Sequence, residues 1–237
     1  MLYLSLSNCI VPTVISDNMP KWFVVYRDAQ AFRMSHYFIS SMSVMSMASA
    51  GFGLTNDCRS DFYVTKPQHI ELPRSLVQVV VYWNMPMHRW LKTYVFKSCR
   101  PYGLFISIFV TYTVSSLLHG LNFQLSAVLL SIGTFSYVEY NLRAKVASAL
   151  GVCCLANPCA RQCDHLFKRN TLLSVLTNSF FSLIAVVHLA YLGVMFEASI
   201  SIQETGYSFF HTLSNWENLN YFSHGLVAFM YLAFLMM

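Results

Sequence analysis

Long apolar runs separated by short polar stretches dominate the hydrophobic pattern of the chain. Four of these runs approach the length of about 20 residues with which a helix crosses the hydrocarbon core of a bilayer. They are Leu104–Leu118, Phe123–Val138, Thr171–Phe196 and Tyr221–Met237. The pattern predicts an all-α protein, a polytopic transmembrane helical bundle that forms a single domain over residues 1–237.

The first two runs are divided by the short break His119-Gly120-Leu121-Asn122. One continuous helix over residues 104–138 would be about 50 Å long, far more than the thickness of the hydrocarbon core. Gly120 and Asn122 disfavour a helix, so we predict a helical hairpin with His119 at its tip.

Two other apolar runs are less suited to crossing a membrane. Leu76–Trp83 is too short, and we expect it to be re-entrant or interfacial. Phe38–Leu54 is rich in Ser, Met and Gly, which favours close packing inside a helical bundle over exposure to lipid.

Charged residues are scarce, and their placement predicts an orientation. Only 11% of the 237 residues are charged, against about 25% in an average soluble domain, which excludes an ordinary soluble globule. The 15 Lys and Arg residues are too sparse for a nucleic-acid-binding surface. No Lys or Arg follows Arg169, whereas Glu197, Glu204 and Glu217 do. The positive-inside rule therefore places residues 85–101 and 140–170 in the cytosol and residues 197–220 on the opposite side.

Three histidines, His36, His119 and His188, fall at predicted membrane depth. An ionisable group is costly there, so each is a candidate functional residue, with hydrogen bonding between helices as the alternative. We favour His119 because it lies at a helix break, where water or substrate can enter. A second polar cluster contains Trp83 and Asn84; it fits either an interfacial aromatic belt or an amide placed inside a polar cavity.

The basic loop 140–170 contains Cys153, Cys154, Cys159, Cys163 and His165. Such residues can hold zinc, but the usual ligand pair separated by two residues is missing. Structural or S-acylated cysteines are the favoured interpretation, a disulfide is disfavoured in the cytosol, and we expect no bound metal.

Trp83-Asn84-x-Pro86, followed 35 positions after Asn84 by His119, resembles the core of the membrane-bound O-acyltransferase family. That family pairs an Asn or Asp in a partly buried loop with a His in a following helix. Six further stretches carry the resemblance: Phe32–Phe38, Glu71–Ser75, Tyr94–Lys97, Val110–Tyr112, Tyr137–Glu139 and His188–Gly193.

The resemblance implies an enzyme of the endoplasmic reticulum membrane that moves a palmitoleoyl group from acyl-CoA to a serine of Wnt proteins, without a cofactor. His119 and Asn84 would be catalytic: His119 as general base, Asn84 either orienting the imidazole or donating to the oxyanion. Trp83, Arg89 and Lys92 would bind substrate. Members of this branch are much longer, so we expect this chain to carry the C-terminal half and to lack the N-terminal transmembrane helices. The alternative is a non-enzymatic transporter or assembly subunit, in which His119 relays protons or packs.

Overall fold

The computed structural model describes residues 2–52, 62–120, 122–160, 163–196 and 209–237. Within these ranges the regular structure is helical, apart from one isolated parallel bridge between Val152 and Phe167. The elements in chain order are α1 (Leu2–Ser5), a short π-helix (Leu6–Ile10), α2 (Val11–Val14), α3 (Lys21–Ser49), α4 (Gln68–Glu71), α5 (Leu76–Trp83), α6 (Met85–Leu91), a second short π-helix (Lys92–Phe96), α7 (Lys97–Cys99), a 3-10 helix (Arg100–Tyr102), α8 (Leu104–Leu118), α9 (Phe123–Leu150), α10 (Leu172–Gly193), α12 (Phe209–Asn218) and α13 (Phe222–Met236).

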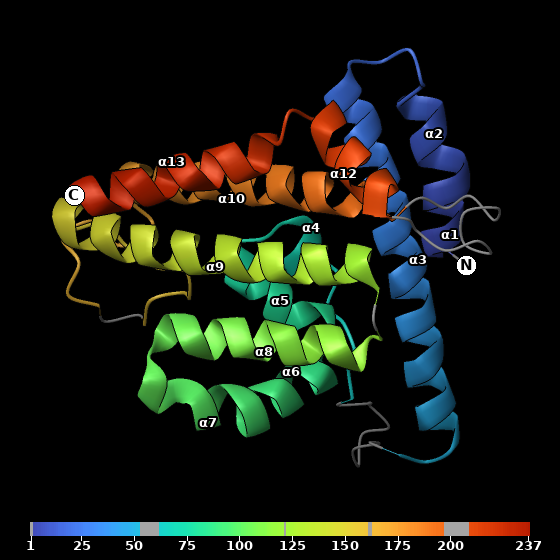
Figure 1. The fold of residues 1–237 in the computed structure, drawn as a ribbon, viewed down its shortest axis with the longest axis horizontal. Coiled ribbons are helices and arrows are strands. Elements are labelled where there is room, and N and C mark those ends of the chain that lie inside the picture. The colour runs from blue at the N-terminus through green and yellow to red at the C-terminus, as the bar shows by residue number, and fades with distance from the viewer. Residues whose placement is uncertain (1, 53–61, 121, 161–162, 197–208) are drawn as a thin grey trace.

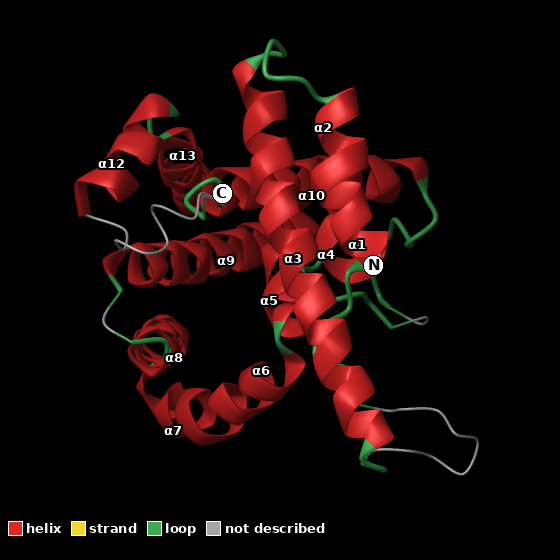
Figure 2. Cartoon of the chain, turned by 90° about the vertical axis from the view of Figure 1, so that its right-hand side faces the viewer, coloured by secondary structure: helices red, strands yellow, loops and turns green. Residues whose placement is uncertain are grey.

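Helices α8, α9, α10 and α13 run side by side along the long axis of the molecule (Figure 1). α9 packs against α8, α5 and α13, while α10 packs against α3 and α13. α3 crosses the ends of α9 and α10 at a steep angle, and α5 lies between α3 and α9 (Figure 2). The core therefore forms where α9 and α10 meet α3, α5 and α13, and it includes Tyr37, Leu76, Phe135, Ala185, Tyr191 and Val227.

Small residues allow a close contact between α3 and α10. At Gly193 of α10, an added Cβ would lie 2.7 Å from the Cβ and 3.2 Å from the Cα of Ala29 in α3. Glycine at this position lets the two backbones approach, which is how membrane helices gain packing energy without a hydrophobic driving force.

The predicted hairpin is present. α8 covers the predicted run Leu104–Leu118, and the helix breaks before Asn122, whose side chain accepts a hydrogen bond from the Leu125 N–H and caps α9. α9 continues twelve residues past the predicted end of its apolar run at Val138, to Leu150. The physical reason is that Glu139 and Arg143, which interrupt the apolar pattern, form a buried ion pair one helical turn apart.

Within the described ranges, α10 alone is long and apolar enough to cross a membrane by itself: it has 22 residues with a mean hydropathy of 1.9. α12 and α13 would form a second span if taken together, although they are bent by 68° at the break between them. α8 is apolar but has only 15 residues. The all-α prediction is confirmed for the described residues, and the number of crossings stays a prediction.

One packing prediction was wrong. Most of Phe38–Leu54 belongs to α3, which already begins at Lys21, and its Ile39, Met42 and Met45 side chains are 63%, 48% and 63% exposed. This half of α3 extends beyond the body of the molecule (Figure 2) instead of packing inside it.

Some residues on which the orientation prediction depends are outside the described ranges. They are Arg161, Glu197 and Glu204.

Candidate active site

The short helix α5 ends at Trp83 and is followed directly by Asn84, two of the predicted site residues. Ser75 is its N-cap: the hydroxyl accepts a hydrogen bond from the Gln78 N–H at 3.2 Å. Asn84 ends α5 and begins α6, because its extended backbone (φ −144°, ψ 87°) interrupts the helix. The Asn84 Oδ1 atom accepts from the Met87 N–H at 3.2 Å, so the side chain caps α6.

The C-terminal end of α5 is fixed by α3. The imidazole of His36 donates from Nε2 to the Trp83 carbonyl at 3.2 Å, and its ring stacks on the indole of Trp83 with centroids 4.3 Å apart and planes 3° apart. The Thr65 hydroxyl donates to the same carbonyl at 2.8 Å. Trp83 and Asn84 therefore occupy defined positions at the break.

The N-terminal end of α5 is fixed by α9. The buried Glu139 carboxylate accepts from the Leu76 N–H at 2.8 Å and from Arg143 Nε at 2.7 Å. Arg143 is fully buried and also donates to the carbonyls of Cys154, at 2.7 Å, and of Arg74. These charge-assisted bonds tie α9, α5 and the loop after α9 to one another.

A second, partly buried ion pair positions the segment that leads into α5. Arg33 of α3 donates to both carboxylate oxygens of Glu71, at 2.7 and 2.9 Å, and the Tyr37 hydroxyl donates to Glu71 at 2.7 Å. α3 thus contacts the α5 region at two points, Glu71 and Trp83.

His119 follows the last residue of α8. Its backbone N–H closes the helix on the carbonyls of Ser115 and Ser116, and Gly120 (φ +89°) turns the chain away with a conformation that favours glycine. The imidazole is exposed, and no hydrogen bond from it to another described residue is present. An exposed imidazole at a helix end is accessible to a substrate.

The structure brings together some of the predicted site residues and not others. Trp83 contacts His36, which the sequence marked by its predicted depth in the membrane. His119 and Asn84 are not joined by a hydrogen bond within the described ranges. The C-terminal end of α8 and the start of α6 lie towards the same end of the molecule (Figure 1), so both helix breaks are on the same side. Arg89 and Lys92 are exposed on α6 and on the turn that follows it.

An apolar groove of about 470 Å³ lies between α8, α9 and α13. Its lining includes Phe105, Tyr137, Val138, His224 and Tyr231. Phe105 is in the first turn of α8 and His119 follows the last, so this groove is near the opposite end of α8 from His119.

Sequence reasoning missed the ion pairs Glu139–Arg143 and Arg33–Glu71 as parts of the site. One signal was available: Glu139 and Arg143 are opposite charges four positions apart in an apolar segment, a spacing that pairs side chains along a helix. Arg33 and Glu71 are 38 positions apart, and no local pattern indicates that they pair.

Comparison with known proteins shows similarity over nearly the whole chain. The human protein named protein-serine O-palmitoleoyltransferase porcupine is 39% identical over 211 residues, covering 87% of this chain and 46% of the relative. The protein of the same name from Anopheles gambiae is 39% identical over 242 residues, covering 97% of this chain and 49% of the relative. The one from Mus musculus is 38% identical over 211 residues, with coverage of 87% and 46%. The chain spans about half the length of the curated relatives it matches.

The sequence also matches the model of the membrane-bound O-acyltransferase family over residues 10–146, more than half of its length. That segment includes α5, Asn84, His119 and the Glu139–Arg143 pair. The chain belongs to the membrane-bound O-acyltransferase family.

Proposed function

We propose that this chain contributes the catalytic pair of a multi-pass enzyme of the endoplasmic reticulum membrane, which transfers a palmitoleoyl group from acyl-CoA to a serine hydroxyl of Wnt proteins. The relatives named protein-serine O-palmitoleoyltransferases, which align over most of the chain, support the reaction class. The observation that carries the site assignment is that His119 and Asn84 each follow a helix break and each have a polar side-chain atom without an intramolecular partner among the described residues.

His119 acts as the general base in this proposal. A serine hydroxyl is a weak nucleophile, so the imidazole removes its proton as the oxygen attacks the thioester carbonyl carbon. The new C–O bond forms, the C–S bond breaks, and the protonated imidazole returns the proton to the sulfur of CoA. His119 is suited to this task because its ring is exposed and makes no competing hydrogen bond to the described residues.

Asn84 acts as a hydrogen-bond donor. Its Oδ1 atom already accepts from the Met87 N–H, whereas its amide nitrogen Nδ2 has no hydrogen-bond partner among the described residues. That N–H can donate to the carbonyl oxygen as negative charge develops on it in the tetrahedral intermediate. Of the two roles that the sequence left open, the geometry supports the donor role.

Trp83, Arg89 and Lys92 bind the acyl-CoA substrate in this proposal. Trp83 is held by His36 next to Asn84, so its indole is positioned to line the path of the acyl thioester. Arg89 and Lys92 follow on α6 and the next turn, exposed and without an ion-pair partner in the described chain, and so are available to CoA phosphates.

Substitution of His119 tests the proposal. His119→Ala is expected to reduce palmitoleoyl transfer to a Wnt serine peptide by about 100-fold or more, because a general base contributes about that much. The measurement is acyl transfer in microsomes from cells without endogenous activity, normalised to the amount of enzyme.

Asn122→Ala is the matched control at the same helix break. It removes the cap of α9 and costs about 1 kcal/mol of stability, but leaves the imidazole in place. We expect its turnover per folded enzyme to stay close to that of the parent. Unchanged turnover in His119→Ala would refute the assignment of His119.

A further inference from the structure

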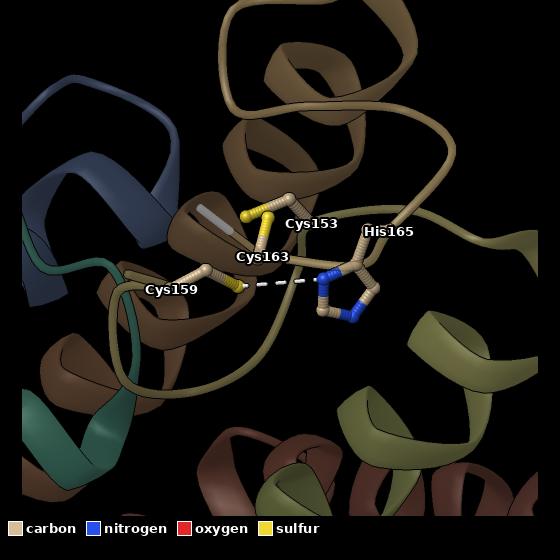
Figure 3. A group of neighbouring side chains, drawn as sticks. All are labelled: Cys153, Cys159, Cys163 and His165. Carbon is tan, nitrogen blue, oxygen red and sulfur yellow. Dashed lines mark hydrogen bonds between the residues drawn. The ribbon is translucent and has the colours of Figure 1, made fainter. Parts of the chain in front are cut away.

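Three cysteines and one histidine gather in the loop between α9 and α10. The Sγ atoms of Cys153, Cys159 and Cys163 and a ring nitrogen of His165 all lie within 4.8 Å of one another. Figure 3 shows the four side chains converging from successive parts of the loop, with Cys159 Sγ 3.8 Å from His165 Nδ1. Cys153 is fully buried and the other three are half-buried.

These separations fit one tetrahedral metal ion. With Zn–S bonds of about 2.3 Å and Zn–N bonds of about 2.0 Å, two sulfurs of a tetrahedral site are about 3.8 Å apart, and a sulfur and a nitrogen about 3.5 Å. The observed separation of Cys159 and His165 is close to this value, and the other separations require movements of about 1 Å or less. Three thiolates and one imidazole are a donor set typical of structural zinc.

The surroundings balance the charge of such a site. One Zn²⁺ with three thiolates has a net charge of −1. The guanidinium of Arg74 donates to the carbonyls of Cys153 at 3.2 Å and Leu155 at 3.0 Å, and the Lys168 ammonium donates to the carbonyl of Cys163. Both cations are therefore attached to the backbone that carries the ligands.

The backbone on both sides of the cluster is fixed independently of any metal. The Cys153 N–H donates to the Phe167 carbonyl at 3.0 Å, and the Phe167 N–H donates to the Gly151 carbonyl at 2.8 Å. Asn178 of α10 donates to the Cys153 carbonyl at 3.0 Å. The first and last ligands are thus held next to each other, as a preorganised site requires.

We propose that Cys153, Cys159, Cys163 and His165 bind one Zn²⁺ in a closed structural site, which holds the α9–α10 loop against the N-terminal end of α5. The connection to α5 runs through the same loop: the Ser75 hydroxyl, at the N-cap of α5, donates to the Ala156 carbonyl at 3.0 Å. All four ligand positions are supplied by the protein, so the metal serves the structure and takes no part in acyl transfer. The sequence favoured structural or S-acylated cysteines without a metal, because Cys-x5-Cys-x3-Cys-x-His lacks the common close pair.

The test is the metal content of the whole protein, purified in detergent without chelator. We expect about one zinc per chain by elemental mass spectrometry. Cys159→Ser and His165→Ala are expected to lose at least about four-fifths of the zinc, whereas His165→Cys retains it because a fourth thiolate completes the tetrahedron. Cys154→Ser is the matched control: Cys154 is the buried neighbour of Cys153, but its thiol faces the Arg143 carbonyl and is not part of the cluster.

Thiol chemistry distinguishes the alternatives and does not depend on how well a variant folds. In the unsubstituted protein, the three thiols are expected to resist maleimide until a zinc chelator is added. Release of the thiols by a reductant alone would identify a disulfide, and release by hydroxylamine alone would identify S-acylation. Either result overturns the zinc site, as does zinc below about one-fifth equivalent or a zinc content that the Cys159 and His165 variants leave unchanged.

Discussion

Asn84 has two polar atoms with different tasks. Its oxygen caps α6 through the Met87 N–H, and its nitrogen has no hydrogen-bond partner among the described residues. The two tasks can be separated by substitution, because aspartate retains the capping oxygen and loses the N–H donor. Substitutions of Asn84 therefore test which of its two polar atoms the proposed acyl transfer requires.

We expect Asn84→Asp to fold as the parent does and to lose about 100-fold or more in turnover, as expected for the loss of an oxyanion donor. Asn84→Ala is expected to show the same loss of turnover and, in addition, about 1 kcal/mol of lost stability from the missing cap. The measurements are acyl transfer per enzyme and thermal unfolding in detergent. An Asp variant with parental turnover would contradict the donor role and assign Asn84 an accepting role towards the imidazole.

Predicted depth in the membrane does not distinguish the surroundings of His36 from those of His119. The sequence marked it as an ionisable group at membrane depth, which is the same signal that marked His119. In the structure the two differ: His36 stacks on Trp83 and donates to its carbonyl, whereas His119 is exposed beyond the end of α8. His36 therefore acts as a positioning residue for Trp83.

At the scale of helices, the α3–α10 contact controls the position of the site. α3 carries His36 and Arg33, which hold the two ends of the segment containing α4 and α5. α3 and α10 approach each other closely at Gly193 and Ala29. A larger residue at either position pushes α3 away from the body of the molecule.

We expect Gly193→Ala to destabilise the protein by about 1–3 kcal/mol and to lower turnover, because its Cβ would lie 2.7 Å from Ala29 Cβ. The double variant Ala29→Gly with Gly193→Ala moves the methyl group to the other helix and is expected to recover most of the loss. Thermal unfolding and acyl transfer of both variants are the measurements.

Gly225→Ala in α13 is the control, because a Cβ at that position meets no atom within 4 Å. We expect it to be neutral or slightly stabilising, since alanine is the better helix former. Equal losses in the Gly193 and Gly225 variants would show that the contact with Ala29 does not account for the effect.

The elements differ in how well the sequence predicts them, for physical reasons. α8 is predicted because its apolar run is followed directly by Gly120 and Asn122, which favour a turn and a cap. The full lengths of α9 and α3 are missed because Glu139, Arg143 and Arg33 interrupt the apolar pattern. The partner of Arg33 is distant in sequence, whereas the spacing of Glu139 and Arg143 is a local signal for a helical pair. The cysteine cluster is missed for a related reason: Cys153 reaches Cys159 and Cys163 through a loop conformation that spacing alone does not specify.

At the scale of the whole molecule, the proposed function requires an orientation in the membrane in which each substrate reaches its own end of the proposed site. The basic loops, which include Arg89, Lys92 and the proposed zinc loop, are predicted to face the cytosol, where acyl-CoA is available. The segment 197–220 contains only acidic charges and is predicted to face the lumen, from which a secreted acceptor protein would enter. α10, the described helix able to cross a membrane by itself, connects these two regions.

We expect a short epitope inserted after Gln203 to be lumenal. This position lies outside the described residues, and the expectation rests on the absence of Lys and Arg after Arg169. In cells whose plasma membrane alone is permeabilised, the epitope should be inaccessible to antibody; it should become accessible once the endoplasmic reticulum membrane is opened.

The substitution Gln203→Asn offers an independent readout, because it creates the glycosylation acceptor Asn-Glu-Thr at positions 203–205 in a chain that otherwise has none. A glycan on this variant that is lost when Thr205→Ala is added would confirm exposure to the lumen. An epitope accessible from the cytosol would invert the orientation, and with it the proposed assignment of acyl-CoA to the basic side of the site.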